Sequence, residues 1–347
     1  MNSIANLPII SVVIPNHNGS AFLANCLQSL QSQTYRQMEI ILADNDSQDE
    51  SIEITREASP QAVILRMERN LGFAGAVNAG IRASRGEWIA VLNNDTVVPA
   101  DWLAECAVGI QSHPEASFFA CRILDFADRK RIFSAGDCYL RAGLGYRRGQ
   151  EQRDREEFNR ECRIFSACGC AALYRKTVLE EFGGFDERFF AYLEDVDLGL
   201  RLQTAGRIGY YLPRAEVFHH GAGTSGGEFS ALAVRMRTRN SLLVLLKSVP
   251  AAFLLRCLPM IALAQLSWMA RALAHGRIGS YLRGLGGAVI LAPAMIRDRA
   301  RLRPAWKNSK RRFWQEILNS ESLARNDFAE NRAEPGSFFL KLYFRIF

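Results

Sequence analysis

The sequence IISVVIPNHNG occupies residues 9–19 and decides the class of fold. Residues 9–15 are almost wholly apolar or β-branched, and a polar loop follows them. A run of this kind predicts a strand that is buried on both faces, as in a parallel sheet. The pattern returns at residues 38–47 and 87–95, where apolar runs end in DNDS and NND.

Predicted helices separate these strands. Leu23, Leu27 and Leu30 recur at helical spacing, a short strand is expected at residues 62–67, and an Ala-rich helix is expected to run through Ala83. Strands that alternate with helices predict an α/β fold, in which a mainly parallel, Rossmann-like sheet with right-handed crossovers is flanked by helices.

Polar side chains stand where each of these strands ends: Asn16, Asn18, Asp44, Asn70 and Asp95. One such residue alone is typical of a turn or a helix cap. Ligands of open α/β sheets bind beyond the carboxyl ends of the strands, so the repetition of polar ends predicts a ligand site there. Asn93 stands two positions before Asp95, so both side chains could face one metal–diphosphate unit.

The second half of the chain has a different character. Residues 122–163 are rich in Gly and charge and are predicted to form a long, partly mobile insertion. A helix is expected from Glu194 to about residue 205, then a strand at 208–212, and then a His-His-Gly sequence that begins at His219. A His at a strand end could complete a metal site or could be a structural histidine.

Three carboxylates, Glu194, Asp195 and Asp197, fall in the first turn of that helix. The helix dipole favours negative charge there, so capping alone could explain them. Mutual repulsion would also raise the pKa of some of these groups, as a general base requires. One carboxylate could then act as the base while the others orient it.

The positive charge of the chain is concentrated in one segment of the sequence. The chain has 347 residues, 48% of them hydrophobic, and a formal net charge of +7. Residues 235–312 hold sixteen Lys or Arg and one acidic residue, a local charge of +15. Such a segment suits a polyanion, and the interleaved aliphatic runs favour an anionic lipid surface over a nucleic acid.

The eight cysteines form no Cys-x-x-Cys pair, which predicts reduced thiols in a cytosolic protein rather than a zinc site. The N-terminal sequence has no basic segment followed by a long apolar run, so no secretory signal is expected.

Taken together, these stretches resemble family 2 glycosyltransferases, and within them the rhamnosyltransferase-like group. The residues that carry the resemblance are VVIPNHNG at 12–19, ADNDS at 43–47, NLGFAGAVN at 70–78, LNND at 92–95, GGFDERFF at 183–190, EDVDL at 194–198 and VFHHG at 217–221. The match covers about residues 9–245. It implies a GT-A fold and a single-displacement transfer that inverts the anomeric centre of a sugar.

The resemblance also implies roles for individual residues. Asp195 would be the base, flanked by Glu194 and Asp197, and Asp95 would bind a divalent metal, Mg²⁺ or Mn²⁺, with His219 as a second ligand. The implied donor-binding residues are Pro15, Asn16, Asn18, Asp44, Asn70, Gly72, Phe73, Asn78, Asn93, Asn94 and Asp95. The donor would be a dTDP- or UDP-sugar, with L-rhamnose from dTDP-rhamnose the best guess, and the acceptor a saccharide or a lipid-linked saccharide.

One departure from the family pattern is visible. The family's metal motif is often Asp-x-Asp, whereas this chain has Asn93-Asn94-Asp95, so metal dependence could be looser. Two alternatives stay open: a nucleotidyltransferase of related fold, and a catalytically silent membrane scaffold. A nucleotidyltransferase usually carries a Gly-rich loop with Lys or Arg after the first strand, whereas residues 15–20 of this chain contain neither Lys nor Arg.

The rear of the chain, residues 241–347, is predicted to form a helical region apart from a catalytic domain at 1–240. Residues 251–270 are nearly apolar but contain Arg256 and Pro259, and the patch at 285–296 is too short to span a bilayer. We expect interfacial helices with Arg side chains at lipid phosphates, on the cytoplasmic face of the plasma membrane. A spanning helix and a soluble basic subdomain are the alternatives.

Overall fold

The fold is that of a computed structural model, which describes residues 7–221, 227, 229–330 and 338–347, without the side chains of 303–310, 330 and 338. The first six residues, most of the Gly-rich loop after His220, and the side chain of Arg303 lie outside this description.

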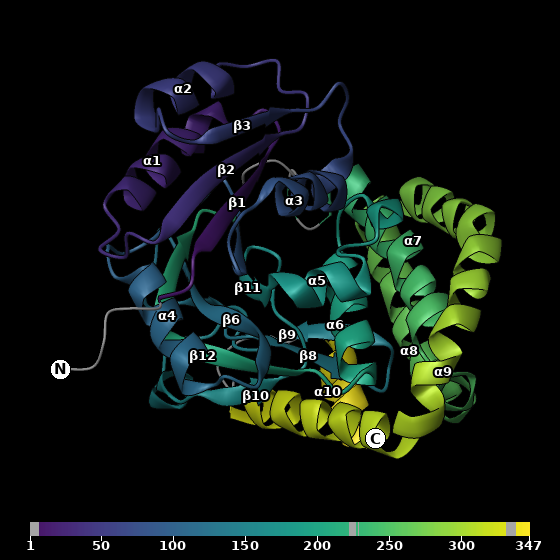
Figure 1. Cartoon of the computed structure of the whole chain (residues 1–347). Coiled ribbons are helices and arrows are strands. Elements are labelled where there is room, and N and C mark those ends of the chain that lie inside the picture. Colours follow the sequence, from purple (N-terminus) through teal and green to yellow (C-terminus); the bar gives the residue numbers. More distant parts are fainter. Residues whose placement is uncertain (1–6, 222–226, 228, 331–337) are drawn as a thin grey trace.

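A central sheet begins with four parallel strands in the order β3-β2-β1-β4. These strands are β1 (Ile10–Asn16), β2 (Met38–Asp44), β3 (Val63–Arg66) and β4 (Trp88–Leu92), and the helices between them are α1 (Ser20–Gln31), α2 (Ser51–Ala58) and α3 (Gly72–Ala83). The predicted order and type of the first hundred residues are confirmed. The carboxyl ends of these strands therefore meet at one edge of the sheet (Figure 1).

The sheet continues with strands of mixed direction, so only its first half is parallel. The strands are β5 (Thr96–Val97), β6 (Ala116–Asp125), β7 (Ile132–Ser134), β10 (Cys162–Ile164), β11 (Ala171–Arg175) and β12 (Ile208–His219). Strand β11 runs antiparallel to both β4 and β6, whereas β12 runs parallel to β6. Because β11 reverses direction between β4 and β6, the predicted α/β class is confirmed with a mixed sheet.

Helices cover both faces of the sheet, as the alternation of β1 requires. Val12 and Ile14 join a core with α1 and α4 (Trp102–Ser112), while Val13 joins a second core with α3, α5 (Lys176–Phe182) and α6 (Glu194–Thr204). Both faces of β1 are thus buried, which explains its continuous apolar run.

The predicted mobile insertion at 122–163 is instead a set of strands and turns. It contains the end of β6, β7, a hairpin of β8 (Asp137–Leu140) and β9 (Leu144–Arg147), the short helix η2 (Glu156–Asn159) and the start of β10. The amide of Tyr139 donates to the Ser320 hydroxyl at 2.7 Å, and Arg141 pairs with Glu321 at 2.6 Å. Residues of α9, about 180 positions further along the chain, therefore hold the hairpin in place. The local composition does not reveal these partners, and so it suggested a mobile segment.

Four helices form the rear of the molecule: α7 (Ala231–Ser248), α8 (Ala251–Ala274), α9 (Ile278–Glu330) and α10 (Phe338–Ile346). Figure 1 shows α9 running beside α7 and then bending beneath the sheet domain. One apolar core joins α6 to α7, α8 and α9. Helix α7 crosses the predicted boundary at residue 240, so a cut there would divide a helix that packs on both regions.

The outer sides of α8 and α9 expose apolar residues: Leu255, Leu258, Leu266, Met269 and Leu273 on α8, and Leu282, Val289, Ile290 and Ile296 on α9. Residues 251–274 and 278–302 are each long and apolar enough, by length and composition alone, to cross a membrane; the most apolar 18-residue windows within them have mean hydropathies of 1.5 and 1.2. The second patch, predicted to be too short to span, thus lies within a longer helix that passes this test of length and composition.

Candidate active site

A buried polar network ties together the ends of β1, β2 and β4. The Asn16 amide donates to Asp44 at 3.2 Å and to the Ser47 hydroxyl at 3.0 Å, and Asn94 donates to Asn16 Oδ1 at 2.6 Å. A Cβ at Gly19 would lie 2.0 Å from Asn94 Nδ2, so only glycine fits beside this network. Three predicted donor residues, Asn16, Asp44 and Asn94, thus occupy one rigid floor.

Around this floor, Pro15 is half-buried at the end of β1, and Asn18 is exposed. The backbone N–H of Asn18 donates to the Ser47 hydroxyl at 2.9 Å. Asn18 has a φ of 52°, a left-handed conformation that Asn tolerates better than most residues. The structure therefore brings both residues to the edge where the strands end.

The turn at residues 70–72 is held by a residue that the sequence did not single out, Asn45. Its amide donates to Asn70 Oδ1 at 2.9 Å and to the Gly72 carbonyl at 3.0 Å, and its Oδ1 accepts the Leu71 N–H at 2.7 Å. Gly72 has a φ of +74°, and a Cβ there would lie 2.4 Å from the Phe190 carbonyl oxygen. The position of Asn45 within DNDS was the available signal.

Asn78 does not fit its predicted role as a donor ligand. Its amide donates to the Phe185 carbonyl at 2.7 Å and to Glu187 at 3.1 Å, and its Oδ1 accepts the Phe185 N–H at 3.0 Å. Because these bonds occupy the amide, Asn78 joins α3 to the loop before α6. Phe73, by contrast, lies beside Gly169, in the turn that bonds Asp195.

Asp95 and His219 lie together at the same edge of the sheet. His219 Nε2 is 3.2 Å from Asp95 Oδ1, and both side chains are more than nine-tenths buried. The pairing of His219 with Thr96 between β12 and β5 brings them together, although they are 124 positions apart. A neutral imidazole nitrogen and a carboxylate oxygen repel each other at this distance unless a proton or a cation lies between them.

These two side chains fit a divalent cation, since imidazole nitrogen and carboxylate oxygen are both suitable ligands. Asn93 is half-buried beside them, and its backbone N–H donates to the Cys170 carbonyl at 2.9 Å. The pair therefore offers one carboxylate and one imidazole, and Asn93 precedes Asp95 by two positions in the chain.

Asp195 lies in the first turn of α6 and accepts two backbone hydrogen bonds. The N–H groups of Gly169 and Val196 donate to its two oxygens at 3.0 and 2.8 Å. Burial raises the pKa of Asp195, yet part of the residue stays accessible, as a base that meets a substrate needs. Glu194 beside it is buried, and burial together with the charge of Asp195 raises the pKa of Glu194 well above its usual value.

A third carboxylate, Asp137, joins this cluster from the β8–β9 hairpin. Ligand-type atoms of Asp137, Cys168 and Asp195 all lie within 4.8 Å of one another. Burial, with the charge of Asp195 added, raises the pKa of Asp137 to about 8. Sequence reasoning missed Asp137 because it lies in the segment taken for an insertion, and no local motif marks it.

Arg147 supplies the positive charge of this region. It faces Asp137 across the hairpin register, and it opposes the rise in pKa of both Asp137 and Asp195. Its guanidinium lies 4.3 Å from the ring centre of Phe133, which in turn packs edge-on against His219 at 4.4 Å. Arg147 and Phe133 thus link the Asp95–His219 pair to the carboxylate cluster, and the sequence indicated neither.

Asp197 does not belong to this cluster, contrary to the predicted catalytic trio. Its oxygens accept bonds from Lys247 at 2.7 Å, Arg201 at 2.9 Å and Ser248 at 2.6 Å, and the side chain is fully buried. Burial would raise the pKa of Asp197, but the charges of Lys247 and Arg201 lower it below its usual value. Asp197 therefore joins α6 to α7 through a buried ion pair.

The backbone before α6 is strained. Phe190, Tyr192 and Leu193 have positive φ values of 65°, 71° and 66°, which non-glycine residues seldom adopt. Such conformations cost on the order of 1–3 kcal/mol each, and the surrounding structure must hold them. They lead directly into the first turn of α6, which carries Asp195.

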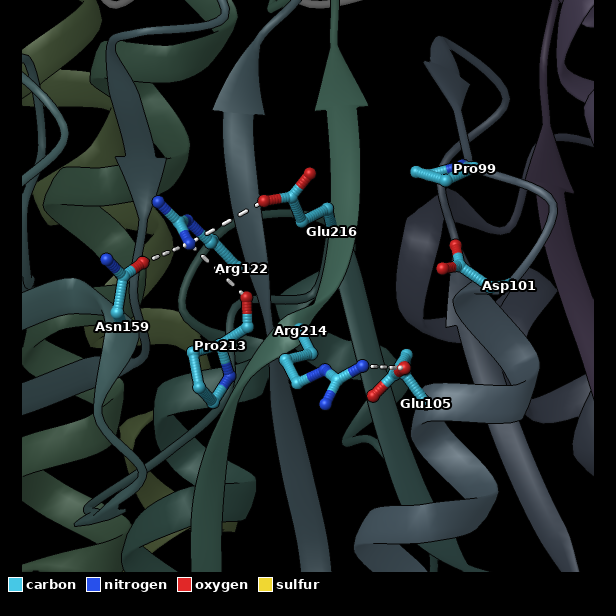
Figure 2. Close-up of a pocket in the computed structure, with 8 residues that line it drawn as sticks. All are labelled: Pro99, Asp101, Glu105, Arg122, Asn159, Pro213, Arg214 and Glu216. Atoms are coloured by element: carbon cyan, nitrogen blue, oxygen red, sulfur yellow. Dashed lines mark hydrogen bonds and ion pairs between the residues drawn. The ribbon is translucent and has the colours of Figure 1, made fainter.

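A cavity of about 480 Å³ lies elsewhere, between α4 and the bulge in β12. Figure 2 shows Arg122 at its centre, reaching Asn159, Glu216 and the Pro213 carbonyl. None of the predicted donor or catalytic residues lines it. We assign this hollow to ion pairs that support the sheet, and not to the reaction.

Known proteins resemble the chain in sequence. Residues 11–183 match the family described as Glycosyl transferase family 2. An N-acetylglucosaminyl-diphospho-decaprenol L-rhamnosyltransferase of Mycobacterium tuberculosis is 30% identical over 242 residues, which cover 63% of this chain and 78% of the relative. A PGL/p-HBAD biosynthesis glycosyltransferase of Mycobacterium bovis is 27% identical over 198 residues, covering 56% of this chain and 69% of the relative.

Solved structures share the fold. A Staphylococcus aureus protein, TarS (residues 1–349), solved in complex with UDP-GlcNAc, superposes with a TM-score of 0.55 and 14% identity, and 91% of each chain is covered. A mannosyltransferase from Pyrobaculum calidifontis, in complex with GDP-Man and Mn²⁺, gives a TM-score of 0.52 and 17% identity, covering 88% of this chain and 87% of the other. From its sequence matches and its GT-A fold, the chain belongs to glycosyltransferase family 2.

Proposed function

We propose that this glycosyltransferase moves a sugar, L-rhamnose from dTDP-rhamnose, onto a lipid-linked saccharide with inversion at the anomeric carbon. The observation that carries the proposal is the Asp95–His219 pair beside the carboxylate cluster around Asp195, at the edge where the strands end. The turn at residues 168–170 lies between them, since Cys170 accepts the N–H of Asn93, two positions before Asp95, and Gly169 donates to Asp195.

The donor end of the site follows from these contacts. Asp44 and Asn16 form a rigid polar floor for the base and ribose, and Asp95, His219 and Asn93 would hold a divalent metal. When bound, the metal would neutralise the diphosphate leaving group. Arg147 offers a further positive charge on the same side of the sheet.

Asp195 would take the proton from the acceptor hydroxyl. The raised pKa of Asp195 makes it a stronger base than an ordinary carboxylate. Its two backbone hydrogen bonds hold the carboxylate in one orientation. A single displacement, with the base on the face opposite the leaving group, inverts the sugar. Glu194 and Asp137 would orient Asp195 through their buried, readily protonated carboxyls.

The acceptor is proposed from two independent observations. The Mycobacterium tuberculosis relative is named for a diphospho-decaprenol acceptor. The outer faces of α8 and α9 expose apolar side chains in a segment of strongly positive charge, which suits an anionic bilayer surface. We therefore place the enzyme on the cytoplasmic face of the plasma membrane, where nucleotide sugars are available.

A donor panel tests the proposal. Purified protein is incubated with membrane lipid extract and with radiolabelled dTDP-rhamnose, UDP-GlcNAc, UDP-galactose or GDP-mannose. We expect label to enter the lipid fraction from dTDP-rhamnose, and EDTA to suppress that transfer until Mn²⁺ or Mg²⁺ is restored. Transfer from another donor would contradict the rhamnose assignment, and EDTA-resistant transfer would contradict the metal role of Asp95. No transfer from any donor would favour the silent scaffold.

A further inference from the structure

The loop at residues 189–193 carries the strained backbone that leads into Asp195, and α7 holds it. The side-chain amide nitrogen of Asn240 lies within hydrogen-bond distance of three carbonyl oxygens of this loop, which share its two hydrogens: Phe189 at 3.0 Å, Ala191 at 2.9 Å and Tyr192 at 2.6 Å. Asn240 is fully buried, so these bonds do not compete with water.

Arg239 fixes the orientation of that amide. Its Nε donates to Asn240 Oδ1 at 2.8 Å, which turns the Asn240 NH₂ group toward the loop. The Arg239 guanidinium also donates to the carbonyls of Arg188 and Phe189, at 3.0 and 2.6 Å. Two adjacent residues of α7 thus satisfy four carbonyls of the segment at 188–192.

The donor site holds the same loop from its other side. The Phe190 carbonyl accepts the Ala74 N–H at 3.2 Å, and Gly72 leaves no room for a Cβ against that carbonyl. The loop therefore lies between the first turn of α3 and α7. Its last residue, Leu193, precedes α6 and accepts the Asp197 N–H at 3.0 Å.

We propose that Asn240, oriented by Arg239, is a positioning residue that holds the 189–193 loop in its positive-φ conformations and thereby aims Asp195 at the acceptor. The proposal rests on the proposed role of Asp195 as the base. It makes the rear helices part of the catalytic apparatus, because α7 packs against α6 and α9 in one apolar core.

The test compares Asn240→Ala with Thr238→Val. Thr238 is a fully buried polar residue of the same helix, but its hydroxyl bonds to Val234 and Trp268 and not to the loop. We expect hydrogen exchange in a peptide spanning residues 187–198 to become at least about tenfold faster in Asn240→Ala, because the loop opens locally. Thr238→Val should leave that peptide unchanged.

Kinetics supply the second readout. Turnover of Asn240→Ala should fall about 10- to 100-fold while the donor KM changes less than about threefold, because misplacement of the base affects chemistry and not donor binding. Unchanged exchange in Asn240→Ala, or the same acceleration in Thr238→Val, would overturn the proposal. If Asn240→Ala does not fold, the same two readouts on Arg239→Gln decide, because this variant frees the Asn240 amide to turn.

The exchange and kinetic measurements distinguish a failure of the proposed function from a failure of the role proposed for Asn240. If wild-type protein transfers no sugar from any donor, the proposed function fails while the exchange experiment still reports on Asn240. If transfer is normal and exchange does not respond, Asn240 is not the residue that holds the loop.

Discussion

The front and the rear of this molecule contribute to the site in opposite ways. In the front, the network of Asn16, Asp44, Ser47 and Asn94 joins strand ends that the sheet places side by side. In the rear, Asn240 and Lys247 of α7 bind backbone and carboxylate groups about 50 residues earlier in the chain. The comparison shows that local motifs mark the residues proposed to face the donor, whereas no local motif marks the residues proposed to position Asp195.

The largest effect should come from the carboxylate at which the two regions meet. We expect Asp195→Asn to reduce turnover by about 10²- to 10⁴-fold, because it removes the general base. Binding of the nucleotide diphosphate, measured by calorimetry, should be unchanged. The control is Glu180→Gln, a half-exposed acid on α5 that should keep wild-type turnover. If Asp195→Asn retains more than about a tenth of wild-type turnover, Asp195 is not the sole base.

The buried ion pair between α6 and α7 should be the next most sensitive point. Asp197→Asn should lower the free energy of unfolding by about 3 kcal/mol, because Arg201 stays buried with only neutral partners and Lys247 keeps one carboxylate, Asp186, in place of two. Chemical denaturation measures this loss.

The matched control is Glu156→Gln, which breaks an exposed pair with Arg160 and should cost less than about 1 kcal/mol. The double variant Asp197→Asn/Lys247→Met should recover part of the loss, since it removes a buried cation that has lost one of its two carboxylates and leaves Asp186 paired with Arg188. Equal effects of Asp197→Asn and Glu156→Gln would mean that front and rear are not joined by this pair.

Asp137, in the β8–β9 hairpin, should make the free energy of unfolding depend on pH. The pKa of Asp137 rises from 3.8 to about 8 on burial, so the folded state binds more protons than the unfolded state between these values. Its contribution to stability is full below about pH 4 and is lost as pH rises through 8.

We therefore expect Asp137→Asn to flatten the decline of the free energy of unfolding between pH 5 and pH 8.5, measured by urea titration. Asp128→Asn, at a residue of the exposed loop after β6, should leave the decline unchanged. Parallel curves for wild type and Asp137→Asn would show that Asp137 is not proton-bound in the folded state.

The smallest effect concerns the outer face of the rear helices. Replacing Val289 and Ile290, which are 74% and 78% exposed, by Asp should weaken sedimentation with anionic vesicles by about tenfold or more, because it removes apolar area from the docking face. Val108→Asp, at a 55% exposed position on α4, should have no effect.

The salt dependence of vesicle binding separates the contribution of charge from that of apolar contacts. High salt should weaken vesicle binding of the wild type without abolishing it, since salt screens the arginines but not the apolar contacts. Complete release by salt would mean that charge alone accounts for the binding. Equal binding of the wild type and the Val289/Ile290 variant would exclude the α8–α9 face as the docking surface.

The sequence by itself determined the parallel strands β1 to β4, the helices between them, and the edge where Asn16, Asp44 and Asp95 gather. It could do so because strand ends and buried runs are local patterns, and parallel topology brings successive ends to one edge. It also marked Glu194 and Asp195 at the start of α6, because the carboxylates are adjacent in the chain.

Only the tertiary structure decided which of the marked residues face one another. It removed Asp197 and Asn78 from the site by giving their polar groups other partners, and it added Asp137 and Arg147 from a hairpin held by α9. It also assigned Asn240 to the loop that leads into Asp195. These outcomes depend on contacts between segments 30 to 180 residues apart, whose geometry no local spacing or propensity encodes.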